Sequence, residues 1–275
     1  MRFRICSITF AGLIMSALAH GQLADPYEPS RNACCLAGAA RNLADQLLDW
    51  DQLGRYYTAN QELKRQPVDP KRVVFMGDSI TDFWRLAEYF PGKPYVNRGI
   101  GGQTTPQMLV RMYPEVVQLR PAAVVFLAGT NDIARNTGPV SPEMVQQNIM
   151  AMTDLAQHSG IKVVLCSVLP VSDYPFLKQQ QAAAPPPSPT PGRGGAFPRQ
   201  QMTANHPAQD ILKLNAWLKD YAARVKAVYA DYFSAMVDEK GWLKDALSDD
   251  GLHPNAAGYK VMAPIVEAAI QKALQ

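Results

Sequence analysis

Five short apolar runs alternate with longer amphipathic stretches along this chain, and this alternation restricts the folds that it can adopt. The runs predict strands at residues 73–76, 95–97, 124–128, 163–168 and 227–231. The stretches predict helices at residues 104–119, 142–158, 208–226 and 255–274. Strands that are apolar almost throughout are covered on both faces, and regular strand–helix alternation favours parallel pairing. We therefore predict an α/β fold, a three-layer α/β/α sandwich around a mostly parallel five-stranded sheet.

Length and charge set further limits. The chain has 275 residues, 47% of them hydrophobic, which suits one α/β domain after N-terminal processing. The formal net charge is +3, and the first 19 residues hold Arg2 and Arg4 but no acid, so the remainder carries +1. Such a balance gives no electrostatic basis for binding nucleic acid, and no nucleic-acid partner is expected.

The N-terminus is typical of a secretory signal peptide at residues 1–19. Arg2 and Arg4 precede an apolar run at residues 5–18, and Ala17-Leu18-Ala19 fits a cleavage site. A buried helix or a retained anchor is the alternative, but the run is shorter than the ~20 residues that a membrane span needs. We expect a secreted or periplasmic protein with no integral membrane segment after processing.

Two segments lie outside the strand–helix repeat. Residues 20–70 are a predicted N-terminal helical extension, in which apolar residues recur at helical spacing between residues 42 and 64. That stripe suits either a helix packed on the flank of the domain or one that covers substrate or a partner. The domain itself is expected at residues 71–275. The domain has an insert at about 178–209 that is rich in Gln, Pro and Gly, a composition that predicts no packed structure. The insert is either a tolerated insertion or a mobile rim of the site.

Cysteine usage predicts no metal site. Cys6 would leave with the signal peptide, and Cys34, Cys35 and Cys166 show no metal-type spacing. Cys166 lies in an apolar run and is expected to be a buried small hydrophobe. The adjacent Cys34 and Cys35 suit either a strained disulfide or two free residues on a helix or turn.

Four short polar or glycine-rich blocks lie at the ends of predicted strands or just before a predicted helix. They are Gly77-Asp78-Ser79-Ile80, Gly99-Ile100-Gly101-Gly102, Gly129-Thr130-Asn131-Asp132 and Asp250-Gly251-Leu252-His253. Parallel sheets bind ligands beyond the carboxyl ends of their strands, so we expect these blocks to meet there. Ser79 lies at a predicted strand-to-helix turn, where a serine serves either as a nucleophile or only as a helix N-cap.

Elimination among the four histidines favours His253 as a base. His20 lies at the signal junction, and His206 lies in the insert. His158 ends a predicted helix, where the helix dipole favours a histidine without any catalytic role. Only His253 has a carboxylate at close fixed spacing, in a loop before a helix. The alternative is an ordinary histidine of a surface loop.

Over about residues 70–272, and in this order, the four blocks resemble those of the SGNH (GDSL-type) ester hydrolases, a family with a flavodoxin-like fold. The resemblance implies a catalytic triad with Ser79 as the nucleophile and His253 as the base. The spacing usual in that family implies that Asp250, rather than the adjacent Asp249, orients His253.

The same resemblance implies an oxyanion hole made of the backbone N–H groups of Ser79 and Gly102 and the side-chain amide of Asn131. Turn geometry for Gly102 and a local Asx-turn for Asn131 are the alternatives. Two positions depart from the usual pattern of the family: Gln103 stands where Asp is common, and Ile80 stands where Leu is usual. Neither departure removes a group that the resemblance assigns to catalysis.

These residues predict a secreted serine ester hydrolase that acts through an acyl-enzyme intermediate, with no metal or organic cofactor. We expect a small-molecule or glycan ester as substrate. A short acyl group such as acetyl on a carbohydrate comes first, because export would place the protein among polysaccharides. The alternatives are a short-chain lipase, a lysophospholipase, a thioesterase, or a non-catalytic carbohydrate-binding protein on the same fold. No oligomeric state is predicted.

Overall fold

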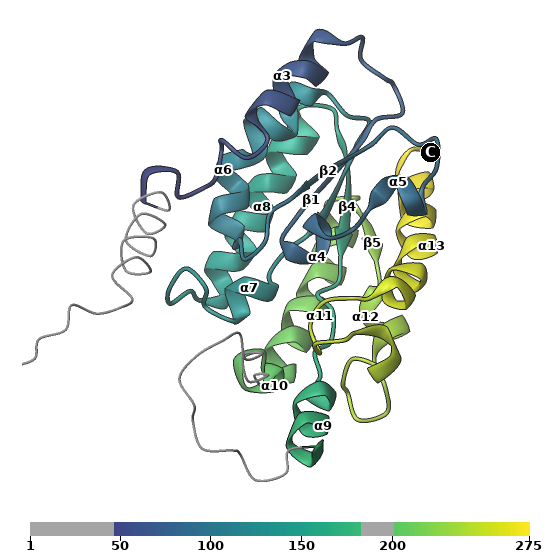
Figure 1. Cartoon of the computed structure of the whole chain (residues 1–275). Helices are drawn as coiled ribbons and strands as arrows, with labels where there is room; N and C mark the ends of the chain where they lie inside the picture. The colour runs from purple at the N-terminus through teal and green to yellow at the C-terminus, as the bar shows by residue number, and fades with distance from the viewer. Residues whose placement is uncertain (1–46, 183–200) are drawn as a thin grey trace, which may run out of the picture. The chain divides into compact units, whose positions relative to one another are not determined.

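The computed structural model describes residues 47–182 and 201–275 (Figure 1). Residues 1–50 and residues 51–275 form two separate units, and all the helices and strands named below belong to the second. The predicted signal peptide at residues 1–19, together with Cys34 and Cys35, lies outside the described residues.

Within the described residues, the second unit is built on a five-stranded parallel sheet. The strands are β1 (Val73–Gly77), β2 (Tyr95–Gly99), β3 (Ala123–Leu127), β4 (Lys162–Cys166) and β5 (Val228–Ala230). Each begins and ends within about two residues of its predicted bounds, a difference no larger than that between methods of assigning element ends. The predicted α/β class and parallel sheet are confirmed, and the spatial order β2-β1-β3-β4-β5 is the flavodoxin-like one.

Helices cover both faces of the sheet (Figure 1). One face packs against α6 (Thr105–Glu115), α8 (Pro142–His158) and α11 (Ala208–Arg224). The other packs against α13 (Ala256–Ala273) and the short helices α4 (Ser79–Asp82), α5 (Leu86–Tyr89) and α12 (Tyr232–Met236). Successive side chains of a strand point to opposite faces of the sheet. Val74 and Met76 therefore pack in one core cluster, and Val73 and Phe75 pack in the other.

The helix predicted at residues 104–119 ends early. α6 stops at Glu115 and is followed by the 3₁₀ turn η1 (Val117–Leu119). Pro114 lies in the last turn of α6 and has no backbone N–H to continue the helical hydrogen bonds. Arg120 then leaves the turn in a left-handed conformation, at a φ of 49°.

The prediction of a single helix between residues 42 and 64 is wrong for the part of this range that the structure describes. Turns occupy most of residues 49–56, and α3 spans only Tyr57–Arg65. Gln52 has a positive φ of 56°, which an α-helix does not tolerate. The residue that α3 buries is Asn60, at 3% exposure, rather than a member of the predicted apolar stripe. The helix therefore packs through polar contacts.

Helices also occupy both ends of the predicted insert at residues 178–209. α9 is Tyr174–Ala182 and α10 is Met202–Asn205, so the expectation of no packed structure is wrong at these ends. The intervening residues 183–200 lie outside the described part of the chain.

Contacts at the base of the insert explain its ordered ends. The Tyr174 hydroxyl at the start of α9 donates to Asp238 at 2.6 Å. On the other side, both the N–H and the hydroxyl of Thr203 in α10 donate to the buried carboxylate of Asp173, the N–H at 3.1 Å. These hydrogen bonds fix the two ends of the insert to the domain.

Candidate active site

Ser79 lies at the turn from β1 into α4, at the carboxyl edge of the sheet. The N-cap of this helix is Asp78 and not Ser79, because Asp78 Oδ1 accepts the Ile80 N–H at 2.9 Å. The turn needs a glycine at position 77, since a Cβ there would lie 2.2 Å from Thr81 Oγ1. The hydroxyl of Ser79 does not cap the helix and is therefore available for a different contact. Ser79 is only partly buried.

The structure brings Ser79, His253 and Asp250 together, although 174 residues separate the first two along the chain. His253 Nε2 lies 2.9 Å from Ser79 Oγ, and His253 Nδ1 lies 2.6 Å from Asp250 Oδ2. The other oxygen of Asp250 accepts the backbone N–H groups of Leu252 and His253, at 2.9 and 2.8 Å. One imidazole ring thus bridges a hydroxyl and a carboxylate.

The carboxyl of Asp250 has a pKa well below its usual range. Burial by itself would raise this pKa, but hydrogen bonds from the His253 ring and from the backbone N–H groups of His253 and Leu252 favour the charged form more strongly. Asp250 is therefore ionised at neutral pH. Its charge favours the imidazole tautomer that carries the proton on Nδ1 and turns the lone pair of Nε2 toward Ser79.

The loop that carries Asp250 and His253 is fixed to the segment that follows β4. The Ser172 N–H donates to the carbonyl oxygen of Gly251 at 2.8 Å. Gly251 has a φ of 88°, and a Cβ there would lie 2.1 Å from the Ser172 carbonyl oxygen, so only glycine fits. Directly after the loop, the side chain of Asn255 caps α13. Both contacts restrict where the imidazole can lie.

The two other sequence blocks reach the same place from neighbouring strands. Gly102 follows β2, has a φ of 78° and is exposed, whereas Asn131 is buried in α7 (Thr130–Ile133) after β3. A Cβ on Gly101 would lie 3.7 Å from the Cβ of Ser79, so the glycine-rich loop passes directly beside that serine. The structure therefore gathers every site residue that the sequence predicted.

The amide of Asn131 has a fixed orientation. Its Nδ2 donates to the carbonyl oxygen of Gln103 at 3.0 Å, and its Oδ1 accepts from Asn136 Nδ2 at 2.8 Å. A primary amide carries two N–H donors, and in the described part of the chain only one of them has an acceptor. The second N–H has no protein acceptor among these residues.

Two of these blocks contain a buried aspartate, and the environments of the two carboxyl groups differ. Both oxygens of Asp132 accept from the N–H of Thr105, at 3.1 and 3.0 Å, which ties α7 to α6. Asp78 is fully buried, and burial raises its pKa to about 7, against the hydrogen bond from Ile80. Among the described residues, Asp78 Oδ2 has no hydrogen-bond partner.

His206 is a residue of this region that the sequence did not single out. It follows α10 and is 5% exposed, with Nδ1 3.0 Å from the carbonyl oxygen of Met202. Its Nε2 has no hydrogen-bond partner in the part of the chain that the structure describes. Burial lowers the pKa of the ring, and the charge of His253 acts in the same direction. No local pattern signals this burial, because it depends on how α10 packs.

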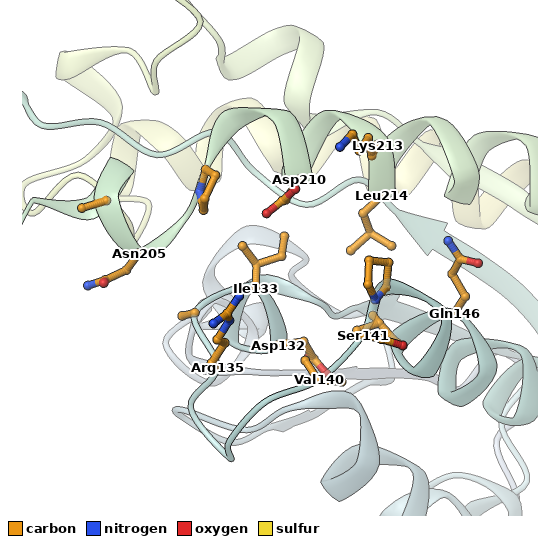
Figure 2. Close-up of a pocket in the computed structure, with 15 residues that line it drawn as sticks. Asp132, Ile133, Arg135, Val140, Ser141, Gln146, Asn205, Asp210, Lys213 and Leu214 are labelled. Atoms are coloured by element: carbon orange, nitrogen blue, oxygen red, sulfur yellow. The ribbon is translucent and has the colours of Figure 1, made fainter.

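A cavity of about 550 Å³ opens beside the residues that follow Asn131 (Figure 2). Its walls come from the α7–α8 connection and the start of α8 on one side, and from α10 and the start of α11 on the other. Apolar and polar side chains alternate around it, among them Ile133, Val140, Leu214, Arg135, Asn205, Asp210 and Lys213. Neither Ser79 nor His253 lines this cavity, so the cavity does not contain the three residues that His253 brings together.

Over residues 47–182 and 201–275, no three His, Cys, Asp or Glu side chains are grouped as metal ligands would be. Nor does this part of the chain contain a helix of the length and apolar character that crossing a membrane requires. Cys166 is buried, as predicted, and it is free. Burial raises the pKa of its thiol to about 12.

Comparison with known proteins gives the same family as the four sequence blocks. Residues 75–261 match the model of the GDSL-like lipase/acylhydrolase family. A crystal structure of a GDSL-like lipase from Bacteroides thetaiotaomicron is 36% identical, with a TM-score of 0.66, and the match covers 81% of this chain and 98% of the lipase. Esterase TesA from Pseudomonas aeruginosa is 30% identical over 148 residues, which are 48% of this chain and 72% of the esterase.

A third relative is the uncharacterized lipoprotein YqeF of Bacillus subtilis, 30% identical over 150 residues. The match covers 45% of this chain and 59% of that lipoprotein, so the chain spans less than two thirds of its length.

The match to this family, with an esterase among the relatives, supports a carboxylic ester hydrolase. The family match covers more than half of the sequence, and the chain belongs to the GDSL-like lipase/acylhydrolase family. The family predicted from the four sequence blocks is confirmed.

Replacing Gly251 by Ala is expected to lower the kcat of ester hydrolysis at least ~10-fold, because the new Cβ would displace Ser172 and move His253. Gly241→Ala is the matched control, since Gly241 also has a positive φ, of 78°, but a Cβ there meets nothing within 4 Å. The positive φ alone should cost each variant about 1–2 kcal/mol of unfolding free energy, and the clash with Ser172 adds to this cost in Gly251→Ala. Equal activity in the two variants would contradict this account of the loop.

Replacing Asp78 by Asn should raise the free energy of unfolding above pH ~7. Folded Asp78 keeps its proton up to a pKa of about 7, against an ordinary value of 3.8. This raised pKa destabilises the fold as pH rises from 3.8 to about 7, by about 4 kcal/mol at most, and the loss is complete above that range. Denaturant titrations between pH ~4 and ~9 measure the effect, with Asp154→Asn on the exposed side of α8 as control. A difference that does not grow with pH would rule the explanation out.

Proposed function

We propose that this protein is a secreted serine ester hydrolase that works through an acyl-enzyme intermediate. The observation that carries the proposal is the bridging position of His253, 2.9 Å from Ser79 Oγ through Nε2 and 2.6 Å from Asp250 through Nδ1. A serine hydroxyl is a weak nucleophile until a base takes its proton. This geometry supplies the base and the carboxylate that orients it, so the three residues form the proposed catalytic triad.

In the proposed reaction, Ser79 Oγ bonds to the ester carbonyl carbon while its proton passes to His253 Nε2. The tetrahedral oxyanion collapses, the bond to the alcohol oxygen breaks, and His253 gives its proton to the departing alcohol. Water then attacks the acyl-enzyme carbonyl while His253 takes its proton. A second collapse breaks the bond to Ser79 Oγ, which recovers the proton from His253 as the acid leaves. Asp250 remains ionised throughout because its pKa is lowered, and its charge stabilises the imidazolium.

The proposed oxyanion hole consists of the backbone N–H groups of Ser79 and Gly102 and the Nδ2 group of Asn131. Ser79 opens α4, where the first N–H groups have no helical acceptor. Gly102 has no Cβ, so its backbone can approach a ligand closely. Contacts with Gln103 and Asn136 orient the amide of Asn131 in advance of the reaction. Donors oriented in this way are worth several kcal/mol when the oxyanion forms.

For the substrate, we propose a short acyl ester, such as acetyl, on a carbohydrate. Phe83 is 57% exposed, and its ring centroid lies 5.2 Å from that of His253. It offers an apolar aromatic surface beside the reacting centre, which suits the C–H face of a sugar ring. The adjacent cavity presents groups that can hydrogen bond to sugar hydroxyls, among them Arg135, Asn205 and Asp210 (Figure 2).

Export completes the proposal. Its basis is the basic start, apolar run and small-residue cleavage site of residues 1–19. The relative from Bacillus subtilis is named a lipoprotein, which is in keeping with a place outside the cytoplasm for this protein too.

Hydrolysis of p-nitrophenyl esters, from acetate to long-chain acyl groups, tests the function. Acetate should be turned over fastest, and Ser79→Ala should lower kcat at least ~10³-fold because no acyl-enzyme can form. Ser159→Ala, at an exposed serine after α8, is the control.

The outcomes separate the alternatives. Equal or faster turnover of long-chain esters or of thioesters would favour a lipase, lysophospholipase or thioesterase. A folded protein inactive on every ester would favour the non-catalytic carbohydrate-binding alternative. Activity that survives in Ser79→Ala would show that the nucleophile is another residue.

Two adjacent aspartates provide a second test. Asp250→Asn should lower kcat about 10³- to 10⁴-fold, because an amide no longer favours the productive tautomer or stabilises the imidazolium. Asp249→Asn should stay within about threefold of the wild type, as is usual for a surface change, since the Asp249 carboxylate accepts from Asn255 rather than from His253. The same kcat in both variants would contradict the assignment of Asp250.

A further inference from the structure

The chain segment that precedes β1 contacts the loop that carries a proposed oxyanion donor. Residues 51–60 are called the clamp segment here, and residues 99–103 the oxyanion loop. The family match begins only at residue 75, so the clamp segment lies outside it. Three sets of contacts join the two segments, at the start, the middle and the end of the oxyanion loop.

Tyr56 holds the start of the oxyanion loop. Its hydroxyl donates to the carbonyl oxygen of Gly99 at 2.5 Å. The guanidinium of Arg98 lies over its ring, 4.6 Å from the centroid, and Arg98 Nε donates to Asn60 Oδ1 at 2.9 Å. Burial raises the pKa of the Tyr56 phenol, with the charge of Asp82 adding to the effect, so the hydroxyl remains a donor at neutral pH.

Arg55 acts on the middle of the loop through Asp82, which ends the short helix that Ser79 begins. The Arg55 guanidinium lies 2.9 Å from Asp82 Oδ1, and Asp82 Oδ2 accepts the Gly101 N–H at 3.2 Å. One carboxylate therefore joins the clamp segment to the oxyanion loop. The Asp82 side chain is only 17% exposed, which limits the screening of this ion pair by solvent.

Gln103 holds the end of the loop. Its Nε2 donates to the carbonyl oxygen of Asp51 at 2.8 Å, and its Oε1 accepts from Arg111 at 2.5 Å. Arg111 is itself fixed by Glu115, at 2.6 Å, and both of these side chains are fully buried in the domain. The backbone carbonyl of Gln103 accepts from Asn131, so this residue also contacts the other proposed oxyanion donor.

Gly102 has little packing of its own to fix it. It is exposed, and a Cβ there would meet nothing within 4 Å. Its carbonyl oxygen accepts from Asn136 at 3.3 Å, and this is the one hydrogen bond of Gly102 among the described residues. The place of its N–H therefore depends mainly on its two neighbours, Gly101 and Gln103, which the clamp segment holds. A hydrogen-bond donor stabilises an oxyanion well only if it is oriented before the reaction, and glycine gives a free backbone many other conformations.

We propose that the clamp segment is a positioning element of the active site, which orients the Gly102 N–H through Arg55, Tyr56 and the backbone of Asp51. This inference rests on the proposed ester-hydrolase function. Tyr56 contacts the oxyanion loop directly and Arg55 acts on it through Asp82. Neither contacts the reacting atoms, so both are positioning residues. Loss of either contact weakens stabilisation of the tetrahedral intermediate and leaves binding of the substrate almost unchanged.

Tyr56→Phe and Arg55→Gln test the inference in the purified protein with p-nitrophenyl acetate. Each change removes one contact and keeps most of the side chain. The expected result is a kcat lower by about 10- to 100-fold with KM within about threefold of the wild type. Arg55→Lys should recover part of the loss, because an ammonium group can still pair with Asp82.

Matched controls lie close by. Tyr57→Phe changes the adjacent tyrosine, which is 63% exposed. Arg85→Gln removes an arginine that pairs with Glu88 at 3.2 Å, with its own side chain 77% exposed. Both controls should keep the wild-type kcat and KM.

Two further measurements report on the loop itself. Amide hydrogen exchange over residues 99–104 should be faster in Tyr56→Phe and Arg55→Gln than in the wild type, whether or not an ester is turned over. Affinity for phenylboronic acid, which forms a tetrahedral adduct with an active serine, should fall in proportion to kcat.

The results distinguish failure of the inference from failure of the proposed function. Unchanged kcat in both variants of an active enzyme would overturn the inference and leave the ester-hydrolase proposal intact. A rise in KM with unchanged kcat would also overturn it. The same holds for a fall in kcat that equals the fall in the folded fraction measured by circular dichroism. If the wild type hydrolyses no ester, the proposed function fails, and unchanged hydrogen exchange would then overturn the clamp whereas faster exchange would support it.

Discussion

The in-register parallel pairing of β1 with β2 and β3 is the constraint on which the candidate site depends. Gly77, the last residue of β1, lies opposite Gly99 in β2 and Leu127 in β3. All three strands therefore end at the same level of the same sheet edge, which is where parallel sheets bind their ligands. Ser79 and Asn131 follow such strand ends within a few residues, so no long loop is needed to bring them together.

Close packing at this edge explains its glycines and the polar contacts around them. A Cβ on Gly99 would lie 2.1 Å from the backbone nitrogen of Asp82, so β2 can approach α4 only with glycine there. The conformational freedom of glycine is then restricted from outside. Asn97 accepts the Gly99 N–H at 2.8 Å and donates to the Thr81 carbonyl at 2.6 Å, and Tyr56 donates to the Gly99 carbonyl. Hydrogen bonds from neighbouring side chains thus restrict the backbone conformation at this glycine.

Sequence patterns predicted the strands well and the N-terminal segment badly, for related physical reasons. A strand buried on both faces must be apolar throughout, so its composition alone signals its place. Near the N-terminus, Leu53 and Tyr57 follow helical spacing but are exposed. Tyr56 and Asn60 face the domain instead, because they bond to groups 43 and 38 residues away. A pattern of apolar residues cannot report packing that polar contacts provide.

The sequence by itself determined the fold class, the family and the residues of the candidate site, because strand composition and short motifs depend on neighbours along the chain. Only the tertiary structure decided that Asp78 caps α4 while the hydroxyl of Ser79 meets His253. It also decided that His206 is buried and that residues 51–60 reach the oxyanion loop. These are contacts between distant segments, and they form only when whole elements pack, so no local pattern of residues encodes them.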